Sequence, residues 1–306
     1  MIEEKIVVGS EFPLNGLLTI PDGGSGPYPA AVLVHGSGPS DMNEAVYGVK
    51  PFQDLAAGLA QHNIASIRYD KRTFAHAKQM AKLKQITVKE ETIEDAILAT
   101  DILRNDPKID PNRIFIIGHS MGGMLAPRID VEGGNYAGLV ILAGTPRRLE
   151  EVMLSQNEEF LQTANPVVKW IGKRQVKKLF AKFEHLYDMS DEEARKTPVL
   201  GKHVMAIYFK DMGKKQVREY LEASTKPVFV LHGEGDFQVT VKDDFALYKD
   251  ILKNHPNATC KLYPGLNHML MPVVYGDIRK AKKEYSKPQH MAEYVIADIA
   301  AWIHKI

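Results

Sequence analysis

The chain has 306 residues, of which 44% are hydrophobic and 25% are charged, and this composition excludes a disordered, collagen-like or coiled-coil protein. The length is typical of one large domain or two ordinary ones, and such a chain buries roughly 75% of its unfolded surface. The single cysteine, Cys260, excludes an internal disulfide framework and a cysteine-based metal cluster. The net charge of +1 gives no indication of nucleic-acid binding.

The apolar runs of the sequence are too short for a transmembrane segment, which needs about 20 residues. The N-terminus carries Glu3 and Glu4, whereas a secretory signal has basic residues followed by a long apolar stretch. The sequence therefore predicts a cytoplasmic protein without a transmembrane segment.

Short apolar runs alternate with helical patterns along most of the chain. Strands are predicted at residues 5–8, 17–20, 30–34, 64–69, 113–117, 138–143, 227–231 and 259–263. Helices are predicted at residues 50–62, from the capping box of Thr87 and Glu90 onward, and at about 289–305. This alternation predicts an α/β fold, with a mostly parallel central sheet and helices on both faces.

The stretch 146–224 interrupts the alternation, because it contains no convincing strand. An apolar stripe at helical spacing comprises Val176, Leu179, Phe180 and Phe183. We therefore predict a core domain of residues 1–145 and 225–306, with a helical cap inserted at 146–224. The stripe is expected to pack against the mouth of a site in the core domain.

The segment after the strand at 113–117 carries the clearest chemical signature. Gly118-His119-Ser120-Met121-Gly122 matches G-x-S-x-G, with a buried strand before it and a helix after it. In this context the glycines let the strand and the helix pass closely, and the serine oxygen lies above the carboxyl edge of the sheet. Ser120 is therefore the predicted nucleophile, the alternative being a helix N-cap serine.

A serine nucleophile requires a base and a carboxylate that orients the base. Asp236 and His268 each lie a few residues beyond one of the last two predicted strands. The chain order Ser120, Asp236, His268 is the order of the α/β-hydrolase triad, so these three residues are the predicted catalytic set.

Other acidic and histidine side chains are weaker candidates for the triad. Glu234 is an alternative carboxylate in the same loop as the predicted aspartate. Asp243 and Asp244 are expected in the following helix, facing solvent. His119 is expected to pack and to form hydrogen bonds beside the nucleophile, and His232 is expected to bond to the backbone of its own loop.

The loop His35-Gly36-Ser37-Gly38-Pro39 follows the strand at 30–34 and supplies candidate donors for an oxyanion. Glycine allows a backbone to turn its amides toward a reacting group, and the negative charge of an acyl-transfer intermediate requires such donors. We expect the backbone N–H groups of Ser37 and Met121 to form the oxyanion hole. The alternative is a plain turn.

With these segments the chain resembles α/β-hydrolase serine esterases of the dienelactone-hydrolase-like and lysophospholipase-like bacterial group. The matching segments are residues 35–39, 68–72, 118–123, 232–236 and 266–268. Members of this group often carry an Asp-Arg-Asp-Glu-like run after the proline, where this chain has Ser40-Asp41-Met42-Asn43-Glu44. The resemblance implies the α/β-hydrolase fold with residues 146–224 as its cap.

The motifs and the resemblance predict a carboxylesterase that acts on small-molecule esters through an acyl-enzyme. No dinucleotide or phosphate loop and no metal-ligand spacing is present in the sequence, so no cofactor or metal is expected. The alternatives are an acyl-CoA thioesterase or acyltransferase with the same triad, a serine peptidase, and a catalytically silent binding protein of this fold.

Three further groups of residues have two interpretations each. The segment Asp70-Lys71-Arg72 is expected to brace the site through ion pairs, the alternative being contact with an anionic substrate. A basic run is expected to be a solvated face, or else a site for anionic lipid or CoA; it comprises Lys169, Lys173, Arg174, Lys177, Lys178 and Lys182. An acyl pocket is expected to be lined by methionines, which adapt to varied apolar shapes: Met121, Met124, Met153, Met269 and Met271. For Met153 the alternative is core packing within the cap.

Overall fold

The computed structural model describes residues 1–306 except 24–25, 84, 163 and 202–203. Among the described residues an eight-stranded sheet has the order β1-β2-β4-β3-β5-β6-β9-β10. Its strands are β1 (Ile2–Val8), β2 (Leu14–Ile20), β3 (Tyr28–Val34), β4 (Ala65–Tyr69), β5 (Ile109–His119), β6 (Gly138–Leu142), β9 (Val228–Gly233) and β10 (Ala258–Tyr263). All the predicted strands are therefore present.

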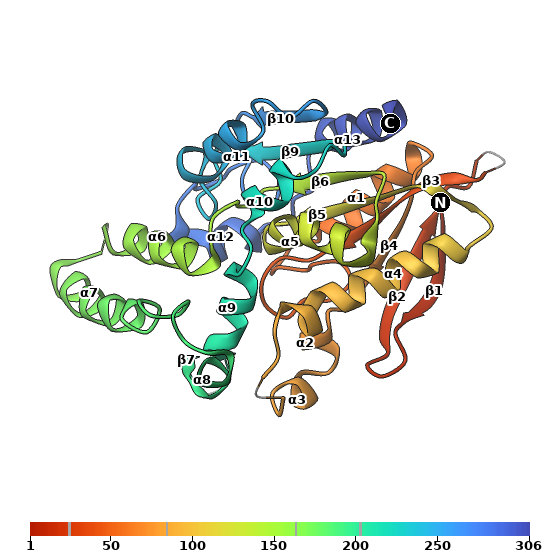
Figure 1. Cartoon of the computed structure of the whole chain (residues 1–306). Coiled ribbons are helices and arrows are strands. Elements are labelled where there is room, and N and C mark those ends of the chain that lie inside the picture. Colours follow the sequence, from red (N-terminus) through yellow and green to blue (C-terminus); the bar gives the residue numbers. More distant parts are fainter. Residues whose placement is uncertain (24–25, 84, 163, 202–203) are drawn as a thin grey trace.

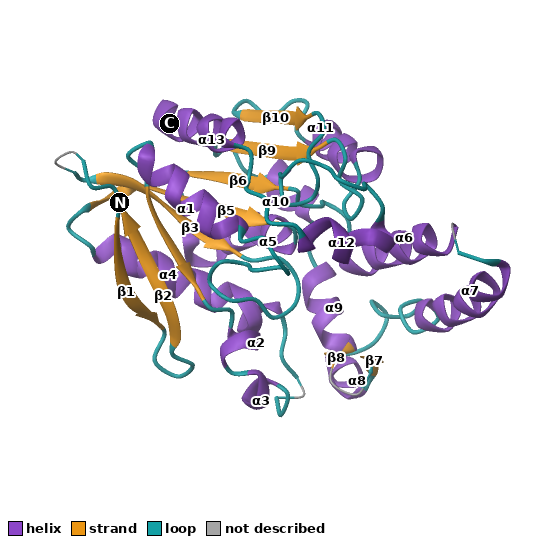
Figure 2. Cartoon of the chain, turned by 180° about the vertical axis from the view of Figure 1, so that it is seen from behind, coloured by secondary structure: helices purple, strands orange, loops and turns teal. Residues whose placement is uncertain are grey.

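The direction of the strands places their carboxyl ends at one edge. β2 pairs antiparallel with both β1 and β4, and the pairs from β4 through β10 are parallel. Figure 2 shows β1 and β2 at one end of the twisted sheet and β9 and β10 at the other. Loops that follow β3, β5, β9 and β10 consequently open toward the same edge, where ligands of open α/β sheets bind.

Alternating side chains of the central strands enter two separate hydrophobic clusters, because successive residues of a strand point to opposite faces. Val32 and Val34 of β3 pack in the cluster that includes α4 and α5, whereas Ala31 and Leu33 pack with α1 and α13. These helices are α1 (Pro51–Gln61), α4 (Glu94–Asn105), α5 (Met121–Ile129) and α13 (Glu293–Lys305). The predicted helices on both faces of the sheet are confirmed.

Shorter helical segments complete the core. They are α2 (Arg72–Ala75), α3 (Ala77–Met80), α11 (Ala246–Ile251), α12 (Ala281–Ser286), the π-helical turns Lys89–Ile93, Asp130–Gly134 and Val241–Phe245, and the 3-10 turn Ile278–Lys280. None of the helices in the described part of the chain is long and apolar enough to span a bilayer.

The chain between β6 and β9 lies beyond the carboxyl ends of the parallel strands, as Figures 1 and 2 both show for α6 to α9. Its elements are α6 (Leu149–Gln162), α7 (Pro166–Phe180), α8 (Asp191–Lys196), β7 (Pro198–Leu200), β8 (Val204–Met205), α9 (Ala206–Gly213) and α10 (Val217–Glu222). β7 and β8 form a small antiparallel pair, so the expectation of no strand in this stretch is wrong. Both strands are too short to give a periodic apolar signal.

The interior of this segment differs from the predicted one. Phe183 is buried against Leu186 and Phe209 in a cluster of the segment's own side chains, with Phe180 packed beside them. α10 packs in the core cluster through Val217 and Leu221. Leu179 and Phe180 of α7 are partly buried against this cluster, and Phe183, which follows α7, is buried in it.

Asp244 is fully buried, so the expectation that it faces solvent is wrong. Its Oδ1 atom accepts hydrogen bonds from Thr145 Oγ1 at 2.6 Å and from Arg147 Nε at 2.8 Å. The backbone N–H of Thr240 donates to Oδ2 at 2.8 Å. The charge of Asp244 is neutralised by Arg147, which lies far away in the sequence. The local helical pattern around Asp244 therefore could not predict that it is buried.

Candidate active site

Ser120 lies at the sharp turn between β5 and α5. Its φ of 52° and ψ of −115° fall in a region that residues other than glycine rarely adopt. The Ser120 N–H donates to Leu142 O at 2.9 Å, and the Ser120 carbonyl accepts from Met124 N at 3.0 Å. The strained backbone is thus held by the sheet on one side and by the first turn of the helix on the other.

Two glycines make this turn sterically possible. A Cβ atom at Gly118 would lie 2.2 Å from Gly122 O, and one at Gly122 would lie 2.1 Å from Val34 O. Both distances are far below van der Waals contact, so the three backbone segments approach as closely as they do only because these positions carry no side chain.

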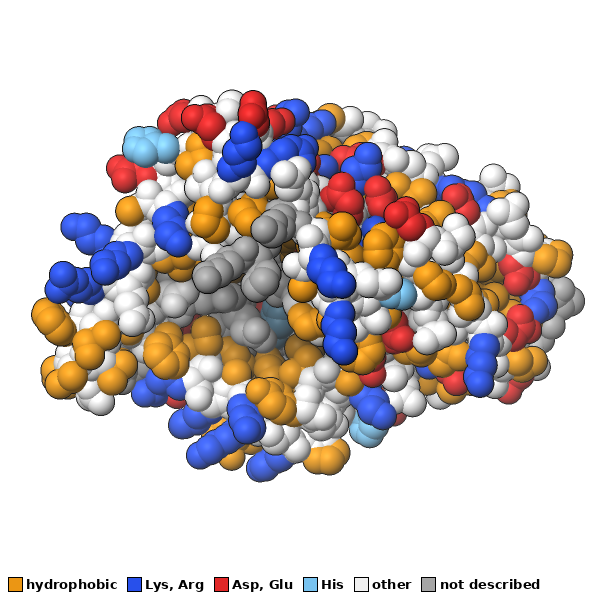
Figure 3. Space-filling model, turned by 90° about the horizontal axis from the view of Figure 1, so that it is seen from below, with side chains coloured by type: hydrophobic (Ala, Val, Ile, Leu, Met, Phe, Trp, Pro, Cys, Tyr) orange, Lys and Arg blue, Asp and Glu red, His pale blue; other side chains and the backbone are white. Residues whose placement is uncertain are grey.

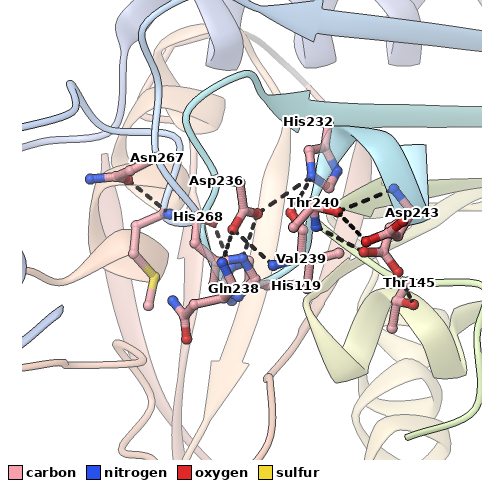
Figure 4. A network of polar contacts seen from close by, with 12 residues as sticks. His119, Thr145, His232, Asp236, Gln238, Val239, Thr240, Asp243, Asn267 and His268 are labelled. Carbon is pink, nitrogen blue, oxygen red and sulfur yellow. Dashed lines mark hydrogen bonds and ion pairs between the residues drawn. The ribbon is translucent and has the colours of Figure 1, made fainter. Parts of the chain in front are cut away.

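His268 and Asp236 form a buried pair in the loops after β10 and β9. His268 Nδ1 lies 2.7 Å from Asp236 Oδ2, and Figure 4 shows the imidazole and the carboxylate pointing toward one another. The N–H groups of Gln238 and Val239 donate to Asp236 Oδ1 at 2.8 and 3.0 Å. Burial would raise the pKa of Asp236, but His268, His232 and the Val239 N–H together lower it, so the carboxylate facing His268 is ionised.

The loop that carries His268 is closed by a buried asparagine. Asn267 Oδ1 accepts from the N–H groups of Met269 and Met271 at 3.0 and 3.2 Å, and Asn267 Nδ2 donates to Glu284 Oε1 at 3.1 Å. These bonds fix the backbone on both sides of the histidine. Asn267 belongs to a segment that the sequence analysis identifies, residues 266–268, whereas no local pattern identifies Glu284.

The predicted triad residues come from three loops that meet at the carboxyl edge of the sheet. The ring of His119, directly before Ser120, lies 4.8 Å from the ring of His268, and His119 Nε2 donates to His268 O at 3.0 Å. No hydrogen bond joins Ser120 Oγ to His268 among the described residues. Such bonds are often long in ligand-free sites and tighten when substrate binds.

The loop after β3 runs beside Ser120. A Cβ atom at Gly36 would lie 3.2 Å from both Ser120 Cβ and Glu44 Oε1. The Gly36 N–H donates to Glu44 Oε1 at 2.6 Å, and the Gly36 carbonyl accepts from Lys71 Nζ at 2.9 Å. Met121 is the first residue of α5, so its N–H has no acceptor within the helix.

Glu44 forms a buried ion pair with His119 behind this loop. The two side chains approach to 3.0 Å. Burial would raise the pKa of Glu44, but His119 and the Gly36 N–H lower it. Burial would lower the pKa of His119, and Glu44 raises it above the ordinary value. His119 therefore makes polar contacts beside the nucleophile as well as packing there, and no local signal in the sequence identifies Glu44 as its partner.

A cavity of about 430 Å³ opens over Ser120. Its described lining from the core is Ser37, Gly38, Thr73, Ile86, Glu91, Ser120, Met121, Met124, Thr145 and Val239. From the segment 146–224 it is Leu149, Val152, Met153, Gln156, Leu200, Val204, Met205, Tyr208 and Phe209. Most of these side chains are apolar, which suits an acyl chain or another apolar group.

The lining corrects part of the sequence interpretation. Met121, Met124 and Met153 line the cavity as expected. Met269 and Met271 are not among its described lining residues and instead pack in a cluster with Val49, Phe237 and Tyr285. Phe180 and Phe183 are not among the described lining residues, because the stripe to which they belong packs within its own segment.

The alternatives for the triad differ in their surroundings. Glu234 is exposed, and His268 pairs with Asp236. The His232 ring donates to Val239 O at 2.7 Å, which agrees with the bond to its own loop that the sequence predicted. Burial raises the pKa of the Cys260 thiol, which disfavours the thiolate. No cluster of potential metal ligands occurs among the described residues.

A family model described as Hydrolase_4, serine aminopeptidase S33, matches residues 32–272. Esterase EstD from Thermotoga maritima is 35% identical over 306 residues, which cover 99% of this chain and 68% of that protein. The chain therefore aligns with this relative over nearly its whole length.

Two solved structures are similar in fold. Est1E from Butyrivibrio proteoclasticus aligns with a TM-score of 0.57 at 15% identity, over 97% of this chain and 99% of that chain. An esterase from Pyrococcus furiosus aligns with a TM-score of 0.56 at 13% identity, over 99% of this chain and 91% of that chain. At these identities the likeness concerns the arrangement of the elements.

We predict that Gly122→Ala lowers the free energy of unfolding by about 3 kcal/mol or more, because the added methyl group meets backbone that cannot move aside. Gly23→Ala is the matched control, since no atom of the described residues other than Gly23 and its chain neighbours lies within 4 Å of its added Cβ. Urea unfolding of both variants measures the difference. Equal stabilities would contradict the close crossing at the turn.

Proposed function

The chain belongs to the Hydrolase_4 family, described as serine aminopeptidase S33, and from this premise we propose that it is a carboxylic ester hydrolase acting through an acyl-enzyme on Ser120. The ester specificity follows from the relationship to Esterase EstD over nearly the whole chain. The observation that carries the mechanism is the buried pair of His268 and Asp236, 2.7 Å apart, at the sheet edge where Ser120 lies.

In the proposed reaction Ser120 Oγ attacks the ester carbonyl while His268 Nε2 accepts the serine proton. Asp236 holds the imidazole in the required tautomer and stabilises the imidazolium. The carbonyl oxygen becomes an oxyanion that accepts hydrogen bonds from the backbone N–H groups of Ser37 and Met121. As the tetrahedral intermediate collapses, the C–O bond breaks and the imidazolium gives its proton to the leaving alcohol.

The second half of the reaction repeats these steps with water. His268 takes a proton from water, the resulting hydroxide attacks the acyl carbonyl, and the same two amides bind the new oxyanion. Collapse breaks the bond to Ser120 Oγ, which recovers the proton from the imidazolium. The products are a carboxylic acid and an alcohol, and the residues named supply every proton transfer.

The polar groups of the cavity favour an ester over a peptide with a free amine. Such a peptide requires a free carboxylate to bind its ammonium group, and Glu91 is the acidic side chain in the described lining. Its Oε1 lies 2.8 Å from Lys71 Nζ, and its Oε2 accepts from the Tyr208 hydroxyl at 2.6 Å. Both oxygens are therefore engaged within the protein.

The basic run of α7 gives no support to a CoA thioester as substrate. Lys169, Lys173 and Lys177 line a groove between α6 and α7, separate from the cavity at Ser120. Figure 3 shows Lys and Arg side chains together with hydrophobic ones at the end of the molecule that α7 forms. This position supports the interpretation of the run as a solvated face.

The segment 146–224 is proposed to act as a cap that selects the acyl group. Met205, Tyr208 and Phe209 contribute to the wall opposite the core residues of the cavity. A wall of this kind excludes water and limits the size of the bound group. The cap thus affects substrate choice, while the triad on the core performs the chemistry.

We predict that Ser120→Ala abolishes both the hydrolysis of p-nitrophenyl esters and labelling by a fluorophosphonate, with kcat falling by about 10⁶-fold. Wild-type protein should cleave the esters with a higher kcat/KM than the matching acyl-CoA or aminoacyl p-nitroanilide. Labelling that survives in Ser120→Ala would contradict the nucleophile assignment. A preference for the thioester or the anilide would contradict the ester assignment.

Asp236→Asn should lower kcat by about 10⁴-fold with little loss of stability, because the amide favours the wrong imidazole tautomer. Glu234→Gln, two residues away and exposed, should retain wild-type kcat. Steady-state kinetics and thermal unfolding of both variants test this pair. A large loss in Glu234→Gln with near-normal Asp236→Asn would reverse the assignment.

Met205→Ala should shift the preferred acyl chain to a longer one, with kcat/KM for that chain relative to the shorter one changing by about tenfold or more. Met189→Ala is the matched control, since Met189 packs against the same apolar cluster of the segment and is not among the described lining of the cavity. Chain-length profiles of p-nitrophenyl esters measure the change. Identical profiles for both variants would argue against a selecting cap.

A further inference from the structure

Both polar groups of Gly36 are held by buried charged side chains. Its N–H donates to Glu44 Oε1 at 2.6 Å, and its carbonyl accepts from Lys71 Nζ at 2.9 Å. Hydrogen bonds to charged groups are about twice as strong as those between neutral groups. The two peptide planes that meet at Gly36 are therefore fixed, directly before Ser37.

Each charged side chain belongs to its own buried ion pair. Glu44 pairs with His119 at 3.0 Å and Lys71 pairs with Glu91 at 2.8 Å, the Lys71 side chain being 2% exposed. Burying a charge is costly even when it is paired, and apolar replacements of such pairs are often neutral or stabilising. Two pairs that converge on one glycine therefore point to a role in positioning the loop.

Lys71 also anchors the far end of the same loop. Its backbone N–H donates to Ser40 O at 3.0 Å, and the side chain of the preceding Asp70 accepts from Met42 N at 2.9 Å. The segment after β4 thus holds the chain between Gly36 and Met42 at both ends. This arrangement agrees with the brace that the sequence predicted for residues 70–72.

The peptide bond between Gly36 and Ser37 is trans, so its carbonyl and its N–H point in opposite directions. Lys71 takes the carbonyl from the buried side, and Ser37 lines the cavity together with Ser120. We propose that Lys71 and Glu44 are positioning residues of the oxyanion hole, holding the Gly36–Ser37 peptide with its N–H directed at the oxygen of the tetrahedral intermediate. The proposal rests on the proposed function.

Without these contacts the peptide is free to rotate. Gly36 itself has little conformational preference, and Gly38 on the other side of Ser37 has a φ of +84°. A rotated Gly36–Ser37 peptide presents its carbonyl oxygen to the oxyanion, which replaces an attraction with a repulsion. We call the contacts of Lys71 and Glu44 with Gly36 the clamp. Loss of the clamp is expected to weaken binding of the transition state and to leave substrate binding unchanged.

The Lys71–Glu91 pair is also connected to the segment above the cavity. Glu91 Oε2 accepts from the hydroxyl of Tyr208 on α9 at 2.6 Å, and this hydroxyl lies 3.7 Å from the sulfur of Met121. Tyr208 thus contacts the residue that carries the second amide as well as the ion pair that orients the first. We therefore expect Tyr208→Phe to lower kcat as well, by a smaller factor than the loss of Lys71 does.

The test compares two neutralised ion pairs from the same stretch of chain. Lys71→Met/Glu91→Gln removes the pair that holds the Gly36 carbonyl. Arg72→Met/Asp95→Asn is the matched control, because Arg72 and Asp95 form a buried pair of similar type with the two side chains 7% and 2% exposed. For each variant, kcat and KM for a p-nitrophenyl ester are measured, together with inhibition by a trifluoromethyl ketone and by the corresponding methyl ketone.

The clamp variant should lose about 10–10³-fold in kcat, with KM changed less than about threefold by the same reasoning. The inhibition constant of the trifluoromethyl ketone, which forms an oxyanion on Ser120, should rise by the same factor as kcat falls. The methyl ketone should bind unchanged. The Arg72→Met/Asp95→Asn control should lose thermal stability but keep its kcat and its inhibition by the trifluoromethyl ketone. If Lys71 had only a structural role, its variant would behave like this control.

Glu44→Gln keeps the shape of the side chain. It serves as the second test of the clamp if the Lys71→Met/Glu91→Gln variant does not fold. Glu44→Gln should also lower kcat and weaken inhibition by the trifluoromethyl ketone, by a smaller factor, with KM and methyl ketone binding unchanged. Unchanged kcat and ketone inhibition in these variants, or an equal loss in the Arg72→Met/Asp95→Asn control, would overturn the proposal. Failure of the proposed function is distinguishable, because the wild-type enzyme itself would then lack Ser120-dependent ester hydrolysis.

Discussion

The structure depends on one close crossing of backbones, where the turn at Ser120 passes over the end of β3. Gly118 and Gly122 leave no room for a side chain there, because a Cβ atom would lie 2.2 or 2.1 Å from a carbonyl oxygen. The crossing holds Ser120 at a positive φ, directly before the first residue of α5. The loops of Asp236 and His268 then reach it from the same edge of the parallel sheet.

The elements that build this edge were predictable because their signals are local. A buried strand, a G-x-S-x-G turn and a helix follow one another within a short segment around Ser120. Asp236 and His268 are each found from their position just beyond a strand. In a parallel sheet the loops at the carboxyl ends of the strands lie side by side. The succession of strands along the chain and the motif were therefore sufficient to predict which loops meet.

The charged groups around the site were less predictable, because their burial depends on partners far away in the sequence. The buried charge of Asp244 is paired with Arg147, and the buried charge of Lys71 is paired with Glu91. Periodicity identifies an apolar face but does not identify the surface against which it packs. For this reason the spacing around Phe183 predicts contact with the mouth of the site, whereas Phe183 packs in the interior of its own segment.

An electrophile bonded to Ser120 is expected to place its oxygen against two particular backbone amides. A crystal structure of the enzyme inactivated by a fluorophosphonate tests this most directly. We predict phosphorus bonded to Ser120 Oγ and the phosphonyl oxygen at about 2.7–3.1 Å from the backbone nitrogens of Ser37 and Met121. Phosphorus on another side chain, or a phosphonyl oxygen facing away from these nitrogens, would contradict the account.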